Sequence, residues 1–185
     1  MIKHVRFFYA ILVLLLAAVG SAPVRAASGD LLEQDAEAAL KALYAKAPGA
    51  KTLGDKAKGV LVFPNVTRAG FILGAQGGDG VLFEHGKATA HYRTAAFSAG
   101  LQAGIQTYGY ALFFMTDDDL AYLKSNSGAG GWSLGVGPTI VIADAGAAKD
   151  ASTLTGKTGV YGFIFDQKGL MAGLSLAGQK IGKIK

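Results

Sequence analysis

The segment from residue 56 to residue 80, KAKGVLVFPNVTRAGFILGAQGGDG, constrains the fold more than any other part of this chain. Its apolar run at residues 60–63 is typical of a strand, and we expect Pro64 to end that strand because proline cannot donate a ladder hydrogen bond. A second apolar run begins at Phe71, and the glycine cluster at residues 77–80 is expected to supply positive φ angles for a tight reversal. The segment therefore predicts a hairpin-rich β unit, and it carries no catalytic signature.

Glycine is abundant throughout the chain, with 27 residues that separate apolar runs without a fixed period. Glycine weakens a strand unless the backbone curves sharply or packs closely, so this pattern favours a strongly curved or barrel-like antiparallel sheet. Two segments have helical patterns: residues 30–47, for which Ser28 is an expected cap, and residues 117–125, which follow the N-cap candidate Thr116. The expected fold is α+β and mainly β, with an N-terminal helix and one short inserted helix. The expected strands cover residues 59–63, 69–75, 80–84, 88–93, 97–106, 109–115, 132–143, 158–165 and 170–179.

Residues 1–26 have the pattern of a secretory signal peptide. A positively charged start precedes an apolar run at residues 7–20, which is too short to cross a bilayer comfortably, and residues 24–26 form a small-residue cleavage site. The alternative is an uncleaved N-terminal anchor. We therefore expect residues 27–185 to form a single domain that is periplasmic or extracytoplasmic after cleavage, or peripheral to a membrane.

Charge and cysteine content exclude several classes of function. Removal of the signal peptide takes away Lys3, Arg6 and Arg25, so the formal charge falls from +5 to +2. The remaining chain has no basic stripe or motif typical of a nucleic-acid-binding domain, and we expect no nucleic acid partner. The absence of cysteine excludes disulfides, a lipid-anchoring cysteine, cysteine nucleophiles and cysteine metal sites.

Two further motif matches lack the structural context that their chemistry needs. Residues 151–158, ASTLTGKT, fit a permissive phosphate loop, but the next residues favour a strand where nucleotide binding needs a helix. Residues 131–135, GWSLG, place Ser133 in a G-x-S-x-G pattern, yet no histidine follows it in the chain. We therefore predict no bound nucleotide, no catalytic residues and no enzyme activity.

Candidate metal ligands are equally sparse. His85 and His91 flank an expected turn at residues 84–87, but a zinc site needs a third protein ligand, and none is evident. The acidic residues at 117–119 are best explained as the first turn of a helix, where negative charge is favourable. We expect neither a metal nor another cofactor.

Four segments resemble, in the same order, the motifs of the SYLF domain family, which comprises lipid-binding and actin-regulating domains. After the opening pattern at residues 56–80, S-x-G-x-Q-x-G is matched at 98–104, L-G…G-P at 134–138, and the K-G-L-[FY]-A-G-[VL]-S-L-[ED]-G ending at 168–178. The resemblance covers residues 35–182. The residues that match the opening pattern are Lys56, Ala57, Lys58, Gly59, Phe63, Pro64, Ala69, Gly70, Phe71, Gly74, Gly78 and Gly80.

Several positions depart from the family patterns. Tyr92 and Ala95 stand where W-S-x-P would place Trp and Pro, Trp132 is unusual in the L-G segment, and Ala177 replaces an acidic residue. The departures leave the expected fold unchanged. They also mean that binding residues are chosen by charge and position and are not transferred from the family.

The resemblance implies a non-enzymatic protein of the bacterial envelope that binds lipid or phospholipid and associates with membranes through a basic and apolar surface. Actin regulation belongs to eukaryotic members and is not expected of an exported single domain; no protein partner is identified. The alternative is a small outer-membrane β-barrel or a structural envelope protein. Basic side chains near anionic headgroups are worth about 1 kcal/mol each. The predicted lipid-binding residues are Lys56, Lys58, Arg68, Lys180 and Lys183.

Aromatic residues are expected to be buried in the hydrophobic core, because aromatic side chains contribute most to the packing energy of a core. Membrane insertion is the less favoured interpretation for each of them. The aromatic residues assigned to the core are Phe63, Phe97, Phe113, Phe114 and Trp132.

Overall fold

The computed structural model describes residues 29–138, 140–144, 159–169, 176 and 178–184. The expected signal peptide, the phosphate-loop-like segment at 151–158 and most of the expected strand at 170–179 lie outside these residues. The helices and strands are α2 (Gly29–Lys46), α3 (Pro48–Gly54), β1 (Gly59–Glu84), β2 (Lys87–Phe114), α4 (Asp117–Asn126), β3 (Trp132–Ser133), β4 (Ile140–Asp144), β5 (Val160–Gly169) and β6 (Lys180–Lys183).

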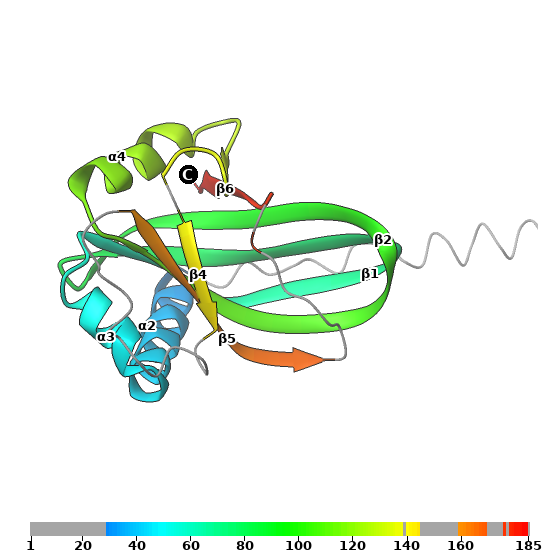
Figure 1. Cartoon of the computed structure of the whole chain (residues 1–185), viewed down its shortest axis with the longest axis horizontal. Coiled ribbons are helices and arrows are strands. Elements are labelled where there is room, and N and C mark those ends of the chain that lie inside the picture. Colours follow the sequence, from blue (N-terminus) through cyan, green and yellow to red (C-terminus); the bar gives the residue numbers. More distant parts are fainter. Residues whose placement is uncertain (1–28, 139, 145–158, 170–175, 177, 185) are drawn as a thin grey trace, which may run out of the picture.

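One long antiparallel hairpin, β1 and β2, dominates the fold (Figure 1). His85 and Gly86 have φ angles of 50° and 74°, the two positive values that a two-residue type I′ turn requires. The turn predicted at residues 84–87 is therefore confirmed. Pairing between the strands extends from Glu84 and Lys87 at this turn to Gly59 and Phe114 at the open end.

The hairpin also folds back on itself, so that β1 and β2 each make a U-shaped bend with β2 on the outside (Figure 1). The two halves of β1 consequently lie side by side. A Cβ built on Gly80 would lie 2.6 Å from the carbonyl oxygen of Val62, and one on Gly70 would lie 2.6 Å from Cα of Gly74. Glycine at these positions permits the close backbone approach on which the bend depends.

Two expectations for this segment are wrong. Strand β1 does not end at Pro64 but continues through it, because a bulge between Phe63 and Val66 takes up the residue that cannot donate. The glycines at 77–80 do not form a reversal either: they lie within β1, and none has a positive φ angle. The short strands expected between residues 59 and 115 are in fact two long, bent ones.

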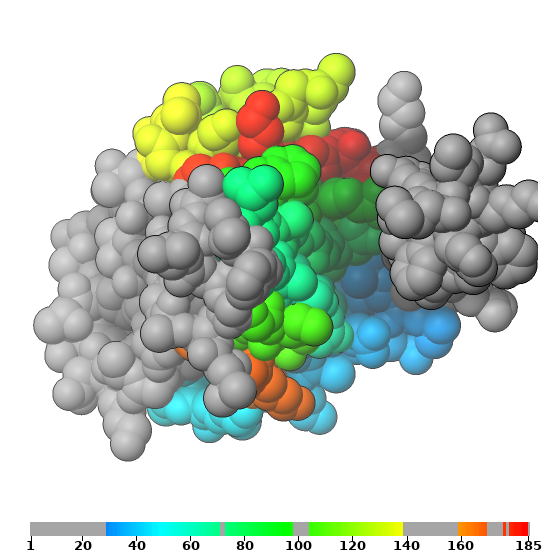
Figure 2. Space-filling view, turned by 90° about the vertical axis from the view of Figure 1, so that its right-hand side faces the viewer, coloured from blue at the N-terminus to red at the C-terminus, as the bar shows by residue number. Residues whose placement is uncertain are grey.

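Two further strands pair with the outer edge of β2, one with each half of the bent strand. Residues 92–95 pair with β6, and residues 106–114 pair with β5, both antiparallel. Strand β3 pairs with β6, and β4 adds the one parallel pairing among the described strands, on β5. In Figure 2, β6 (red), β2 and β1 (green and teal) and β5 (orange) follow one another across the end of the molecule. The expected α+β, mainly β fold with a curved antiparallel sheet is confirmed, although pairing ends at β3 and β4 and the sheet is open.

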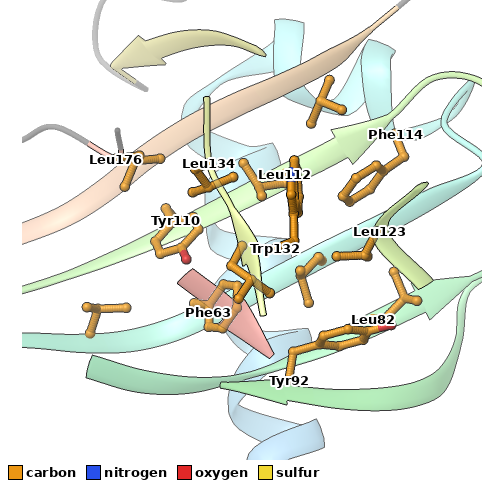
Figure 3. Close-up of a cluster of buried hydrophobic side chains, with 14 of the residues drawn as sticks. Phe63, Leu82, Tyr92, Tyr110, Leu112, Phe114, Leu123, Trp132, Leu134 and Leu176 are labelled. Carbon is orange, nitrogen blue, oxygen red and sulfur yellow. The ribbon is translucent and has the colours of Figure 1, made fainter. Parts of the chain in front are cut away.

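Alternate residues of the hairpin point to opposite faces, which creates two hydrophobic cores. Val60 and Val62 pack in the core beneath α2 and α3. Leu61 and Phe63 belong to the other core, with Trp132 and residues of α4 (Figure 3). Both faces are covered here, which explains why residues 60–63 are all apolar and do not alternate.

The helices follow local sequence signals closely. The helices predicted at residues 30–47 and 117–125 are confirmed as α2 and α4, and the Thr116 hydroxyl accepts a hydrogen bond from Asp119 N at 3.1 Å. Helix α3 was not predicted; it begins at Pro48, and proline suits the first turn of a helix because its missing N–H would have no partner there. No helix in the described part of the chain is long and apolar enough to cross a membrane.

Other predicted strands differ in detail. The strand expected at 132–143 is two strands, β3 and β4, because Gly135 and Gly137 adopt φ angles of 101° and 102° between them. Of the aromatic residues assigned to the core, four are buried, but Phe97 is 89% exposed. The prediction for Phe97 is wrong because its part of the sheet face lies beyond the elements that cover the cores.

Candidate functional site

The predicted lipid-binding residues lie in separate parts of the structure. Lys180 and Lys183 lie on β6, whereas Lys56 and Lys58 are exposed in the connection between α3 and β1. The Nζ atom of Lys58 is 3.6 Å from Oδ2 of Asp117. Arg68 lies in β1 and is 9% exposed. Lys180 and Lys183 both line one surface cavity of the described part of the structure.

That cavity is a groove of about 740 Å³ at the edge of the sheet. One side is the loop of residues 128–131 that follows α4, and the other is formed by β6 and the adjoining stretch of β2. We call it the β6 groove. Its lining residues are Arg93, Ala95, Gly128, Ala129, Gly130, Gly131, Lys180, Gly182, Lys183 and Ile184.

Backbone hydrogen bonds hold the loop against β6. Ser127 N donates to the last turn of α4 at Leu123 O (3.0 Å), and Lys183 N donates to Ser127 O (2.7 Å). Gly131 N donates to Gly128 O (2.9 Å), which closes the turn. The loop is thus tied both to the helix before it and to the strand beside it.

Glycine keeps the groove open. A Cβ built on Gly128, Gly130 or Gly182 would meet no atom within 4 Å. These glycines therefore leave space at the protein surface, in contrast to Gly80, whose position is filled by neighbouring atoms. A ligand could enter the groove without displacing the backbone.

The charge of the groove comes from three side chains. Arg93 forms a two-point ion pair with Asp79, with Nε–Oδ1 and Nη2–Oδ2 distances of 2.6 and 2.9 Å. The hydrogen bonds and the charge of Asp79 raise the pKa of Arg93 above its ordinary value. Lys180 and Lys183 are exposed, and neither forms an ion pair with any described residue. The groove therefore carries a net positive charge, which suits an anionic ligand.

The positions with rejected motif matches have structural roles. Ser133 lies on β3 and pairs with Lys180 of β6. His85 occupies the hairpin turn, while His91 Nε2 lies 3.0 Å from Glu33 Oε1 and joins β2 to α2. Asp119 belongs to the first turn of α4, as predicted. Across the described residues, no three His, Cys, Asp or Glu side chains are grouped as a metal site would need.

Sequence reasoning missed Arg93 and the loop of residues 128–131. The run Gly128-Ala129-Gly130-Gly131 after a predicted helix was a usable signal for an open loop. Nothing local indicated that β6 would lie beside it. No protein-family model matches this chain, and no curated protein matches it either.

Proposed function

We propose that this protein is a non-enzymatic lipid-binding protein of the bacterial envelope and that its β6 groove holds the headgroup of an anionic phospholipid. The observation that carries the proposal is the placement of Lys180 and Lys183, without ion-pair partners among the described residues, on one wall of a glycine-lined groove of about 740 Å³. The resemblance to lipid-binding SYLF domains and the expected export signal agree with it.

The groove offers chemistry that suits a phosphate group. Each lysine ammonium has three donors and a compact charge, and long side chains on an exposed strand can reach a ligand at different depths. Arg93 uses Nε and Nη2 for Asp79, which leaves its other terminal nitrogen outside that pair. Near a membrane surface, each basic residue contributes about 1 kcal/mol of attraction to anionic lipid.

Vesicle co-sedimentation tests the proposal. Protein purified after expression of the full-length sequence is mixed with phosphatidylcholine vesicles that contain graded amounts of an anionic phospholipid, at low and high salt. We expect the bound fraction to rise with the anionic content and to fall with salt, because exposed charges are screened. Absence of binding at every anionic content would refute the proposal.

Two double variants locate the binding surface. Lys180→Ala/Lys183→Ala should weaken binding by about 30-fold, since two charges worth about 1 kcal/mol each are lost. Lys56→Ala/Lys58→Ala removes the same charge elsewhere and is the matched control. Equal effects of the two variants would indicate general electrostatic attraction and contradict a role for the groove.

Gly182→Phe separates the groove's shape from its charge. The position has open space and no positive φ angle, so the new ring should occupy the groove without disturbing the fold. We expect vesicle binding to fall although every lysine is retained. Unchanged binding by Gly182→Phe would mean that the headgroup does not enter the groove.

A further inference from the structure

Several apolar side chains are exposed at the bent end of the sheet. Phe97, Leu73 and Ile105 are 89%, 71% and 66% exposed, and they account for most of the large exposed apolar residues in the described part of the chain. They come from three stretches of β1 and β2 that the bend brings together. This clustering, unlike isolated exposed apolar residues, requires an explanation.

The pairing register places Phe97 and Ile105 in one row across the bend. Phe97 pairs with Ala75, and Ile105 pairs with Ala69. Ala69 and Ala75 lie on opposite sides of the bend in β1, whose halves are neighbours (Figure 1). Side chains alternate between the two faces along each strand, and the buried residues of β1 and β2 show which face each belongs to. By this alternation Phe97, Ala75, Ala69 and Ile105 all lie on the sheet face that carries α2 and α3. We call these four residues, with Leu73, the apolar row.

A second row of residues crosses the same face of the sheet, two positions along each strand nearer to α2 and α3. A lysine stands at each end of this row. On one side Ala95 pairs with Lys180, and on the other Thr107 pairs with Lys168. Directly opposite residues share a face of the sheet, so both lysines flank the apolar row. Neither has an ion-pair partner among the described residues.

The apolar row is also continuous with the β6 groove. Arg93, Ala95 and Phe97 are alternate residues of β2 and point to the same face, and the first two line the groove. Figure 2 looks onto this end of the molecule, where β1 and β2 reach the surface between β6 and β5. A ligand surface that reaches the groove would therefore also meet Phe97.

We propose that the apolar row inserts into the interface of an anionic membrane, with Lys180 and Lys168 at the level of the headgroups. This inference rests on the proposed function and adds how the protein is oriented. Apolar residues next to basic ones are the combination that binds the boundary between headgroups and acyl chains. Long lysine side chains can extend from such a surface to the phosphates.

Charge complementarity favours a membrane over a second copy of this chain. Two acidic side chains of the described residues in β1 and β5 are already engaged: Asp79 pairs with Arg93, and Asp166 pairs with Lys46 at 2.6 Å. Two copies packed through the apolar row would therefore bring lysines close to lysines. An anionic membrane instead supplies apolar and negative surface together.

Fluorescence quenching tests the inserted position. Phe97→Trp places a reporter on the apolar row, and Val136→Trp places one at a 61% exposed position in the loop after β3. Vesicles of anionic phospholipid and phosphatidylcholine brominated in its acyl chains quench only indole groups that enter the apolar region. The native Trp132 is 2% exposed and serves as the unquenched background.

We expect vesicles to quench Phe97→Trp and to leave Val136→Trp unquenched. If Phe97→Trp binds vesicles as the wild type does but is not quenched, the insertion is refuted while the proposed headgroup site stands. If no protein binds vesicles, the proposed function fails and the insertion fails with it.

A second pair of variants measures the contribution of the row. Phe97→Ser/Leu73→Ser should weaken vesicle binding by about tenfold per side chain, with an unchanged melting temperature because both residues are exposed. Leu31→Ser, at a 54% exposed position on α2, is the matched control and should bind normally. A dimer in sedimentation velocity that dissociates in Phe97→Ser/Leu73→Ser would assign the row to a second copy and overturn the proposal.

Discussion

Replacement of Gly80 by alanine should destabilise this protein, because the two halves of β1 approach each other too closely for a side chain. A Cβ at this position would lie 2.5 Å from Cδ1 of Phe63 and 2.6 Å from the carbonyl oxygen of Val62. Carbon atoms in favourable contact are about 3.5–4.0 Å apart, so the neighbours would have to move by about 1 Å. Both neighbours are fully buried and have little freedom to move.

The expected magnitude follows from two opposing terms. Overpacking a buried site costs about 1–3 kcal/mol. Alanine in place of glycine recovers about 0.4–1 kcal/mol by restricting the unfolded chain. At the midpoints of these two ranges the net loss in the free energy of unfolding is about 1.3 kcal/mol, which lowers the melting temperature by about 3–5 °C in a chain of this size.

Urea denaturation and thermal unfolding monitored by circular dichroism measure this effect. Gly182→Ala is the matched control, because it makes the same chemical change in a strand where a Cβ meets no atom within 4 Å. That variant should be unchanged or stabilised by up to about 1 kcal/mol. If Gly80→Ala is as stable as Gly182→Ala, the halves of β1 do not pack as described and the folded-back hairpin is refuted.

Three further predictions concern single side chains, each measured by chemical denaturation against the wild type. Burial opposes ionisation of Glu84, but hydrogen bonds from Lys124 and Thr89 outweigh it and lower its pKa below the ordinary 4.5. The wild type should therefore have a higher free energy of unfolding than Glu84→Gln, and this difference should be complete above about pH 5 and shrink as the pH falls through the lowered pKa. A difference that does not change with pH would contradict this assignment. Burial and, to a smaller extent, the charge of Asp55 raise the pKa of Tyr44 to about 12. Its stabilising contribution is thus complete below about pH 10 and is lost towards about pH 12, so Tyr44→Phe should lose less stability than the wild type over that range. Thr116→Ala removes the cap of α4 and should cost about 1 kcal/mol, and no loss would show that the cap bond to Asp119 is unimportant.

Local signals predicted the elements whose formation depends on nearby residues. The turn at 84–87 and helix α4 are examples. His85 and Gly86 supply both positive φ angles of the turn, and the Thr116 hydroxyl caps α4 by accepting a hydrogen bond from Asp119 N, only three residues away. The same local rules failed at Pro64 and at residues 77–80. There, the bulge and the close approach of the other half of β1 determine the structure, and neither can be recognised in a short window.

Some residues of the candidate site could likewise be predicted from the sequence, and others could not. Lys180 and Lys183 could be chosen from charge alone, but Arg93 joins them only because β6 pairs with a stretch of β2 far away in the sequence. Phe97 was assigned to the core because aromatic residues are usually buried. The exposure of Phe97 depends on which elements cover its part of the sheet face, and the residue type alone does not determine this.

By itself, the sequence determined the mainly β composition, the two longer helices and the hairpin turn, because these follow from side-chain periodicity, caps and backbone preferences over a few residues. Only the tertiary structure decided that the hairpin folds back on itself. That bend places Ile105 near Phe97, and the pairing of β6 with β2 places the lysines beside them. Such contacts depend on packing between distant segments, and local propensities contain no information about which distant segment will be the neighbour.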